Sequence, residues 1–290
     1  MKKWTPVVII VVVVVVGLAL AAGKAMRQSG GEPAASGALP EAPAGAVEKA
    51  AKGQGTAQGT GVGMAAMEQA AQAKKYLFVF FWKEENDETA AMRKVFEAAT
   101  KKAAGKAQSA AVHITDASEK QIVKKFELDR APMPLALAIA PNGAIMGGFP
   151  KKFTEGDLLD AFASPCSEQC MKALQDGKLV FLCVQNKNIK SSEEAMRGVH
   201  DFKADARYSQ ATEVVMLDPV DSAETKFLAD LKIDPRTPEA ITAFLVPPGS
   251  VIAEFKGPTY KDGLVDTLQK AASSTCGPGG CGPGGCGPKK

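Results

Sequence analysis

Residues 76–96, YLFVFFWKEENDETAAMRKVF, decide the fold of this chain. They begin with an unbroken apolar run that is typical of a buried β-strand. A polar turn and a helical pattern follow that run. Asn86 and Thr89 stand where the helix is expected to begin, and side chains of both types accept backbone N–H groups at a helix N-terminus. The stretch therefore predicts a strand, a capped turn and a helix, in that order.

The downstream segments continue an alternating α/β pattern. Residues 109–116, SAAVHITD, are suited to a strand, and residues 118–128, SEKQIVKKFEL, place apolar side chains at helical spacing. Residues 130–149 predict two further strands joined at an Asn-Gly hairpin signal, Asn142-Gly143. The helical segment TEGDLLDAF, residues 154–162, closes a unit of ordinary single-domain size.

This order of elements resembles the thioredoxin-like fold. In that family a strand ending in Phe-Trp precedes two catalytic cysteines, which fall four and seven residues after the Trp. Counted from Trp82, these places are Asn86 and Thr89. The chemistry needs a thiolate there, so the resemblance implies a scaffold without its redox catalyst. The family's cis-proline implies a cis bond between Met133 and Pro134, with an ordinary trans proline as the alternative.

The unit occurs twice. The tripeptide Ala-Met-Arg at 91–93 recurs after 104 residues, and Pro238 follows Pro134 at the same offset. The hairpin at 139–149 and the closing helix at 154–162 recur after 106 residues. A near-constant offset indicates tandem domains. We therefore expect an α/β protein with thioredoxin-like domains at 64–163 and 178–274, the second of which also lacks a Cys-x-x-Cys pair. Its helix is expected to be capped by Ser191 or Ser192.

The N-terminal region predicts attachment to a membrane. Lys2 and Lys3 precede an apolar run from Val7 to Gly23, which resembles a signal sequence or a short transmembrane anchor. We favour residues 1–25 as a retained signal-anchor, with cleavage and secretion as the alternative. Residues 26–63 are rich in Ala, Gly and Pro and predict a flexible linker. The domains are expected outside the cytoplasm, in a cell envelope.

Two of the six cysteines, Cys166 and Cys170, lie in a predicted inter-domain helix at 164–177. Ser164 is its expected cap and Pro165 its first residue. The two thiols share a helix face, although an intrahelical bridge there would be strained. They are candidates for thiol or disulfide chemistry, whereas Cys183 lies inside an apolar strand and is expected to be buried and inert.

The C-terminal residues 275–290 carry the other three cysteines, Cys276, Cys281 and Cys286, among Gly and Pro. This composition predicts a disordered tail. Three alternatives remain for the thiols: low-complexity sequence without a role, redox use, or an all-sulfur metal site suited to Cu(I) or Zn(II).

The net charge of +3 indicates no particular partner, and no basic stripe with interleaved aromatic residues suggests nucleic acid. The sequence favours a membrane-tethered, redox-inactive binding or scaffold protein that holds protein clients and has no cofactor, rather than an enzyme. The alternative is a thiol–disulfide oxidoreductase or metal carrier that uses Cys166, Cys170 and the tail. The resemblance implies a groove for extended peptides, and the residues expected to line it are Trp82, Asn86, Thr89, Met133, Pro134 and Pro238.

Overall fold

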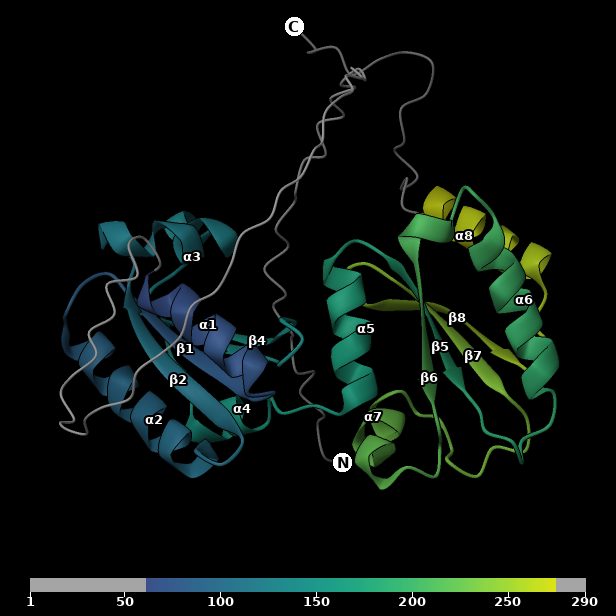
Figure 1. Ribbon diagram of the computed structural model, residues 1–290, viewed down its shortest axis with the longest axis horizontal. Helices are drawn as coiled ribbons and strands as arrows, with labels where there is room; N and C mark the ends of the chain where they lie inside the picture. The colour runs from purple at the N-terminus through teal and green to yellow at the C-terminus, as the bar shows by residue number, and fades with distance from the viewer. Residues whose placement is uncertain (1–60, 275–290) are drawn as a thin grey trace, which may run out of the picture. The chain divides into compact units, whose positions relative to one another are not determined.

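The computed structural model describes residues 61–274, which form two four-stranded sheets, each with helices on both faces (Figure 1). The expected membrane segment, most of the linker and the tail lie outside the described residues. Within residues 61–274, no helix is both long enough and apolar enough to cross a membrane.

The first domain contains the strand order β2-β1-β3-β4. Strand β1 pairs in parallel with β2 and antiparallel with β3, and β4 pairs antiparallel with β3. In chain order, its elements are α1 (Val62–Gln72), β1 (Tyr76–Trp82), α2 (Asp87–Ala103), β2 (Ala107–His113), α3 (Lys120–Lys125), β3 (Leu135–Ile139), β4 (Ile145–Pro150) and α4 (Glu155–Leu159).

The second domain repeats this topology with the strand order β6-β5-β7-β8 and the same strand directions. Its elements are α5 (Pro165–Gln175), β5 (Leu179–Val184), α6 (Ser192–Ala204), β6 (Thr212–Leu217), α7 (Thr225–Asp230), β7 (Ile241–Val246), β8 (Ser250–Lys256) and α8 (Lys261–Ser274). The prediction of two tandem thioredoxin-like units is confirmed by this repetition of element order and strand pairing.

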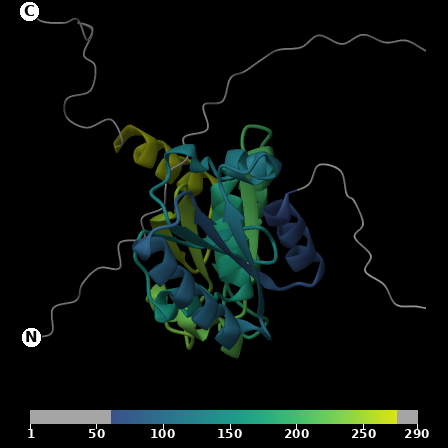
Figure 2. The same ribbon diagram turned by 90° about the vertical axis from the view of Figure 1, so that its left-hand side faces the viewer.

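The core of the first domain has two layers, one on each face of the central strand β1. Phe78 and Phe80 pack with α2 and α4, whereas Val79 and Phe81 pack with α1 and α3. This alternation follows from the two-residue period of a strand. Figure 2 shows α1 and α2 on opposite sides of the sheet.

The second domain divides its core in the same way. Val180 and Leu182 face α5 and α7, and Phe181 and Cys183 face α6 and α8. Helix α5 thus takes the place that α1 has in the first domain. The second unit begins with this helix, ahead of residue 178 where the sequence placed its start. The expected cap is present: Ser164 Oγ accepts from the backbone N–H of Ser167, and Pro165 opens the helix.

Strand register and helix burial confirm the offsets of two of the four repeated motifs and correct the offsets of the other two. The hairpins correspond at an offset of 106 residues, because Phe149 pairs with Ala136 and Phe255 pairs with Thr242. The closing helices keep this offset, since Leu158 and Leu264 are their buried residues.

The Ala-Met-Arg repeat is one residue out of structural register. Its offset would match the buried Phe96 of α2 with the exposed His200 of α6. The buried residues match instead at 103 residues, where Phe96 corresponds to Val199 and Ala99 to Phe202. This offset also relates β1 to β5, because Phe81 faces Leu135 and Val184 faces Ile241.

The expected serine cap of α6 is not made as predicted. Ser191 occupies the N-cap position with a left-handed φ of 61° and no capping hydrogen bond. The Ser192 hydroxyl points back and donates to the carbonyl oxygens of Asn186 and Ile189 at 3.2 and 2.9 Å. The Ser192 side chain therefore stabilises the loop before α6 and does not cap the helix.

A buried glutamate caps the first helix of each domain. Glu119 accepts from the backbone N–H groups of Val62 and Gly63 at 2.6 and 3.1 Å. Its counterpart Glu224 accepts from the N–H of Cys166 at 3.0 Å and from the hydroxyl of Ser164 at 2.5 Å. A carboxylate at this end of a helix satisfies otherwise unpaired N–H groups and is favoured by the helix dipole.

Removing either glutamate cap should destabilise its domain. We expect Glu119→Ala and Glu224→Ala each to lower the free energy of unfolding by about 1–3 kcal/mol, because each leaves buried N–H groups without an acceptor. The measurement is urea unfolding followed by circular dichroism. Glu97→Ala, on the exposed side of α2, is the control and should change stability little. Equal stability of all three variants would show that the buried caps contribute nothing.

Candidate functional site

The end of the first sheet brings together residues that lie far apart in the sequence. Strand β1 pairs with β3 so that Phe81 faces Leu135. The next pair in this register is Trp82 opposite Pro134, at the end of the sheet from which α2 begins. The bond between Met133 and Pro134 is cis, as predicted. Trp82 and Met133 are half-buried beside it.

The two places that carry cysteines in thioredoxins hold the start of α2 together. Asn86 is the N-cap, and its Oδ1 accepts from the N–H of Thr89 at 2.9 Å. The Thr89 hydroxyl donates to the carbonyl of Glu84 at 2.8 Å. Capping by Asn86 was predicted from the sequence. Thr89 is 2% exposed, so its side chain offers no surface to a ligand, whereas Asn86 is exposed.

Trp82 is held between two cationic or ionisable side chains that the sequence did not single out as site residues. Its ring stacks on His113 with centroids 4.1 Å apart and an angle of 26°. The guanidinium of Arg93 lies 4.8 Å from the Trp82 ring centroid, and Arg93 also forms a 2.7 Å ion pair with Glu85. The parallel pairing of β1 with β2 places His113 opposite Trp82. No local sequence pattern indicates the contact with Arg93.

The ring nitrogens of His113 are also engaged. Its Nε2 lies 2.9 Å from the carbonyl oxygen of Lys83, so this nitrogen carries a hydrogen and donates it. The contact ties the end of β2 to the turn that precedes α2. The arrangement positions an aromatic face beside the cis-proline, with the amide of Asn86 and the hydroxyl of Thr89 at the two places that carry cysteines in thioredoxins.

The equivalent end of the second domain is built differently. In the β5–β7 register, where Val184 faces Ile241, Gln185 takes the place of Trp82 and Ala240 takes that of Pro134. Pro238 therefore corresponds to Pro132 rather than to Pro134, which corrects the equivalence expected from the sequence. The shared offset of the two prolines was coincidental.

The chain occupies the strand edge beside Ala240 with its own backbone. Lys190 forms a parallel bridge with Glu239. The Lys190 N–H donates to the carbonyl of Pro238 at 3.2 Å, and the Ala240 N–H donates to the carbonyl of Lys190 at 3.0 Å. In the first domain, by contrast, the backbone of Met133 has no hydrogen-bond partner within residues 61–274. One domain therefore presents an open edge at this position and the other a closed edge.

The described cysteines are unpaired and buried. Cys166 and Cys170 face the core under α5, and Cys183 lies in the cluster on the other face of the second sheet. The Cys166 thiol donates to the carbonyl of Met216 at 3.3 Å. Burial raises the pKa of each of these three thiols to about 12. The reactive thiolate is therefore scarce at neutral pH.

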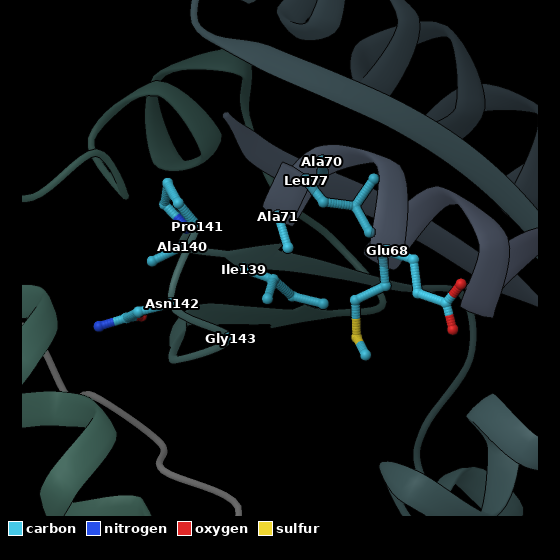
Figure 3. A pocket seen from close by; sticks show the side chains of 10 residues that line it. Glu68, Ala70, Ala71, Leu77, Ile139, Ala140, Pro141, Asn142 and Gly143 are labelled. Carbon is cyan, nitrogen blue, oxygen red and sulfur yellow. The ribbon is translucent and has the colours of Figure 1, made fainter. Parts of the chain in front are cut away.

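An apolar pocket of about 190 Å³ lies at the other end of the first sheet (Figure 3). It is bounded by α1 and by the turn between β3 and β4, where Ala71, Ile139 and Pro141 line it. None of the predicted site residues is in its lining. Among residues 61–274, no group of three or more His, Cys, Asp or Glu side chains could hold a metal ion. The candidate metal ligands Cys276, Cys281 and Cys286 lie outside these residues.

No family model matches the chain, and no curated protein matches it. Among solved structures, the chain is similar to the first two thioredoxin domains of Saccharomyces cerevisiae Eps1p, with 12% identity, a TM-score of 0.25, and coverage of 70% of this chain and 94% of that one. It is also similar to human ERp44, with 10% identity, a TM-score of 0.32, and coverage of 79% and 61%. A third is the NTD_N/C domain of alkylhydroperoxide reductase AhpF from Enterococcus faecalis, with 14% identity, a TM-score of 0.25, and coverage of 70% and 98%.

Strand order, the parallel β1–α2–β2 connection and the position of the cis-proline, rather than these low scores, define the fold. The protein has two tandem thioredoxin-like domains.

The burial of the three described cysteines predicts low reactivity in the folded state. In a variant with Cys276, Cys281 and Cys286 changed to Ser, we expect Ellman's reagent at pH 8 to label no thiol rapidly. Unfolding in guanidinium should expose all three, because it removes the burial that raises the pKa. Rapid labelling of Cys166 or Cys170 in the folded protein would contradict this and would favour a redox role for them.

Proposed function

We propose that this protein is a redox-inactive, thioredoxin-like binding or scaffold module of a cell envelope, tethered to a membrane by residues 1–25. The first domain is its client-binding domain. The observation that carries the proposal is the exchange of both catalytic positions for a helix cap, in which Asn86 accepts from the N–H of Thr89, beside a cis-proline whose neighbouring strand edge is open.

The chemistry of the site supports binding rather than catalysis. A thioredoxin-type reaction requires a thiolate at the start of α2, where the helix dipole lowers the thiol pKa. Neither the amide of Asn86 nor the buried hydroxyl of Thr89 can act in its place. The oxidoreductase alternative is not supported by the other described cysteines, because burial raises their pKa.

The strand edge at Met133 supports the assignment of binding to the first domain. An extended polypeptide can add to an open edge through main-chain hydrogen bonds, and the half-buried Trp82 and Met133 would contact its side chains. We therefore assign the proposed groove to Trp82, Asn86, Met133 and Pro134. The equivalent place in the second domain is filled by Lys190, so Pro238 is left out of the groove.

The loss of redox chemistry can be tested by restoring it. We expect the protein to reduce insulin disulfides no faster than the dithiothreitol background, and the double variant Asn86→Cys/Thr89→Cys to reduce them measurably faster. The helix N-terminus of α2 would activate the introduced thiol. The assay is insulin turbidity, with Asn86→Cys alone as the control that lacks a resolving thiol. Insulin reduction by the unaltered protein at the rate of the double variant would contradict the proposal.

Client binding can be located by exchanging one residue between the domains. Met133 and Glu239 occupy equivalent positions, so the variants Met133→Glu and Glu239→Met are a matched pair. With a fluorescently labelled unfolded polypeptide, anisotropy should show binding weakened roughly tenfold by Met133→Glu, which removes an apolar contact and adds a charge at the groove. Glu239→Met should leave binding unchanged. The reverse pattern would place the groove in the second domain.

A further inference from the structure

Met216 is the one exposed methionine among residues 61–274, with 49% of its surface accessible. It lies on β6, an edge strand of the second sheet, and lines a pocket of about 330 Å³ together with Met196 of α6. The strand registers place Ala111 at the equivalent position of the first domain. The second domain therefore presents an oxidisable thioether to solvent where the first presents a methyl group.

The sulfur of Met216 contacts a buried amide. Gln185 is only 8% exposed, and its Nε2 lies 3.9 Å from Met216 Sδ. Within residues 61–274 this sulfur is the only acceptor for Nε2, and a thioether is a weak one. Gln185 Oε1 is enclosed and has no partner there, and turning the amide would leave Nε2 unpaired instead. The buried N–H groups of Gln185 thus face a sulfur where a strong acceptor would stabilise them.

We propose that Met216 is a site of oxidation by hydrogen peroxide, and that the oxygen of its sulfoxide accepts a hydrogen bond from Nε2 of Gln185. The sulfur gives two electrons to peroxide. The O–O bond breaks, one oxygen atom forms the S–O bond, and the other leaves as water with both hydrogens. The inference does not rest on the groove proposed for the first domain.

The contact between Met216 and Gln185 distinguishes this position from an ordinary surface methionine. Oxidation converts a flexible apolar side chain into a polar one, which disrupts structure where the new oxygen has no partner. At Met216 the donor is already in contact with the sulfur, so the oxygen needs only a rotation of a half-exposed side chain to reach it. Oxidation therefore makes the lining of this pocket more polar and improves the pairing of the buried amide.

The first test is the order in which the methionines react. The full chain is treated with hydrogen peroxide, and the oxidation of each methionine is followed by peptide mass spectrometry. We expect Met216 to react roughly fivefold faster than the half-buried Met196, which lines the same pocket, because it is more accessible to peroxide. Met133, also half-buried, is a second reference. Equal rates at Met216 and Met196 would overturn the proposal.

The second test is the hydrogen bond itself. In NMR spectra of the full chain, the side-chain amide protons of Gln185 should move downfield and exchange more slowly once Met216 is oxidised. Met216→Leu, treated with peroxide in the same way, is the control for all other methionines and should show neither change. An unmoved Gln185 amide signal after conversion of Met216 would contradict the proposal, and this measurement requires no variant of Gln185.

The variant Gln185→Leu tests the energetic consequence. It replaces a buried amide by an apolar side chain of similar size, and an unchanged thermal midpoint before oxidation would confirm that it folds. Oxidation of Met216 should then lower the midpoint of Gln185→Leu by about 4–8 °C more than that of the unaltered protein, the shift expected from one neutral hydrogen bond. The same shift in both proteins would show that Gln185 does not bind the sulfoxide.

Discussion

The two central strands are buried on both faces, and this burial determines where the helices of each domain must lie. Tyr76–Phe81 in β1 and Val180–Val184 in β5 are buried at every position. A strand that is apolar on both sides must be covered on both sides. Each sheet is therefore enclosed by two pairs of helices, and the strand end from which α2 or α6 begins is left as the place where polar chemistry can be built.

The two domains use that strand end in different ways. In the first, the two positions that carry cysteines in thioredoxins form a helix cap, and Trp82 is fixed between His113 and Arg93 beside an open strand edge. In the second, Lys190 closes the edge, and Gln185 stands at the position of Trp82. Duplication of one scaffold followed by separate changes at the same place accounts for both arrangements.

Much of the fold could be predicted because hydrophobic periodicity and turn signals are local. The strand Tyr76–Trp82, the Asn142-Gly143 hairpin and the cap at Asn86 all follow from short stretches of sequence. The register between the repeats could not be predicted in full. The Ala-Met-Arg and proline coincidences are as regular as the true repeats. The burial of Phe96 and Val199 excludes the first, and the β5–β7 register excludes the second.

The site was harder to predict because its contacts are long-range. Arg93 and His113 meet Trp82 through pairing and packing that leave no local pattern. The glutamate caps join residues more than fifty positions apart, Glu119 to Val62 and Glu224 to Cys166. The open edge at Met133 depends on what the rest of the chain leaves unpaired, and no sequence motif encodes it.

Hydrogen–deuterium exchange in the presence of an unfolded polypeptide locates the strand edge at which the polypeptide binds. Met133 lies between two prolines and carries the only backbone N–H in the segment Pro132–Pro134, so its exchange reports on that edge alone. We expect the polypeptide to slow exchange at Met133 and at residues 82–86. Exchange at Lys190 and Ala240, whose N–H groups are already paired, should not change. Slowed exchange confined to the second domain, or no change at Met133 when the polypeptide is bound, would contradict this expectation.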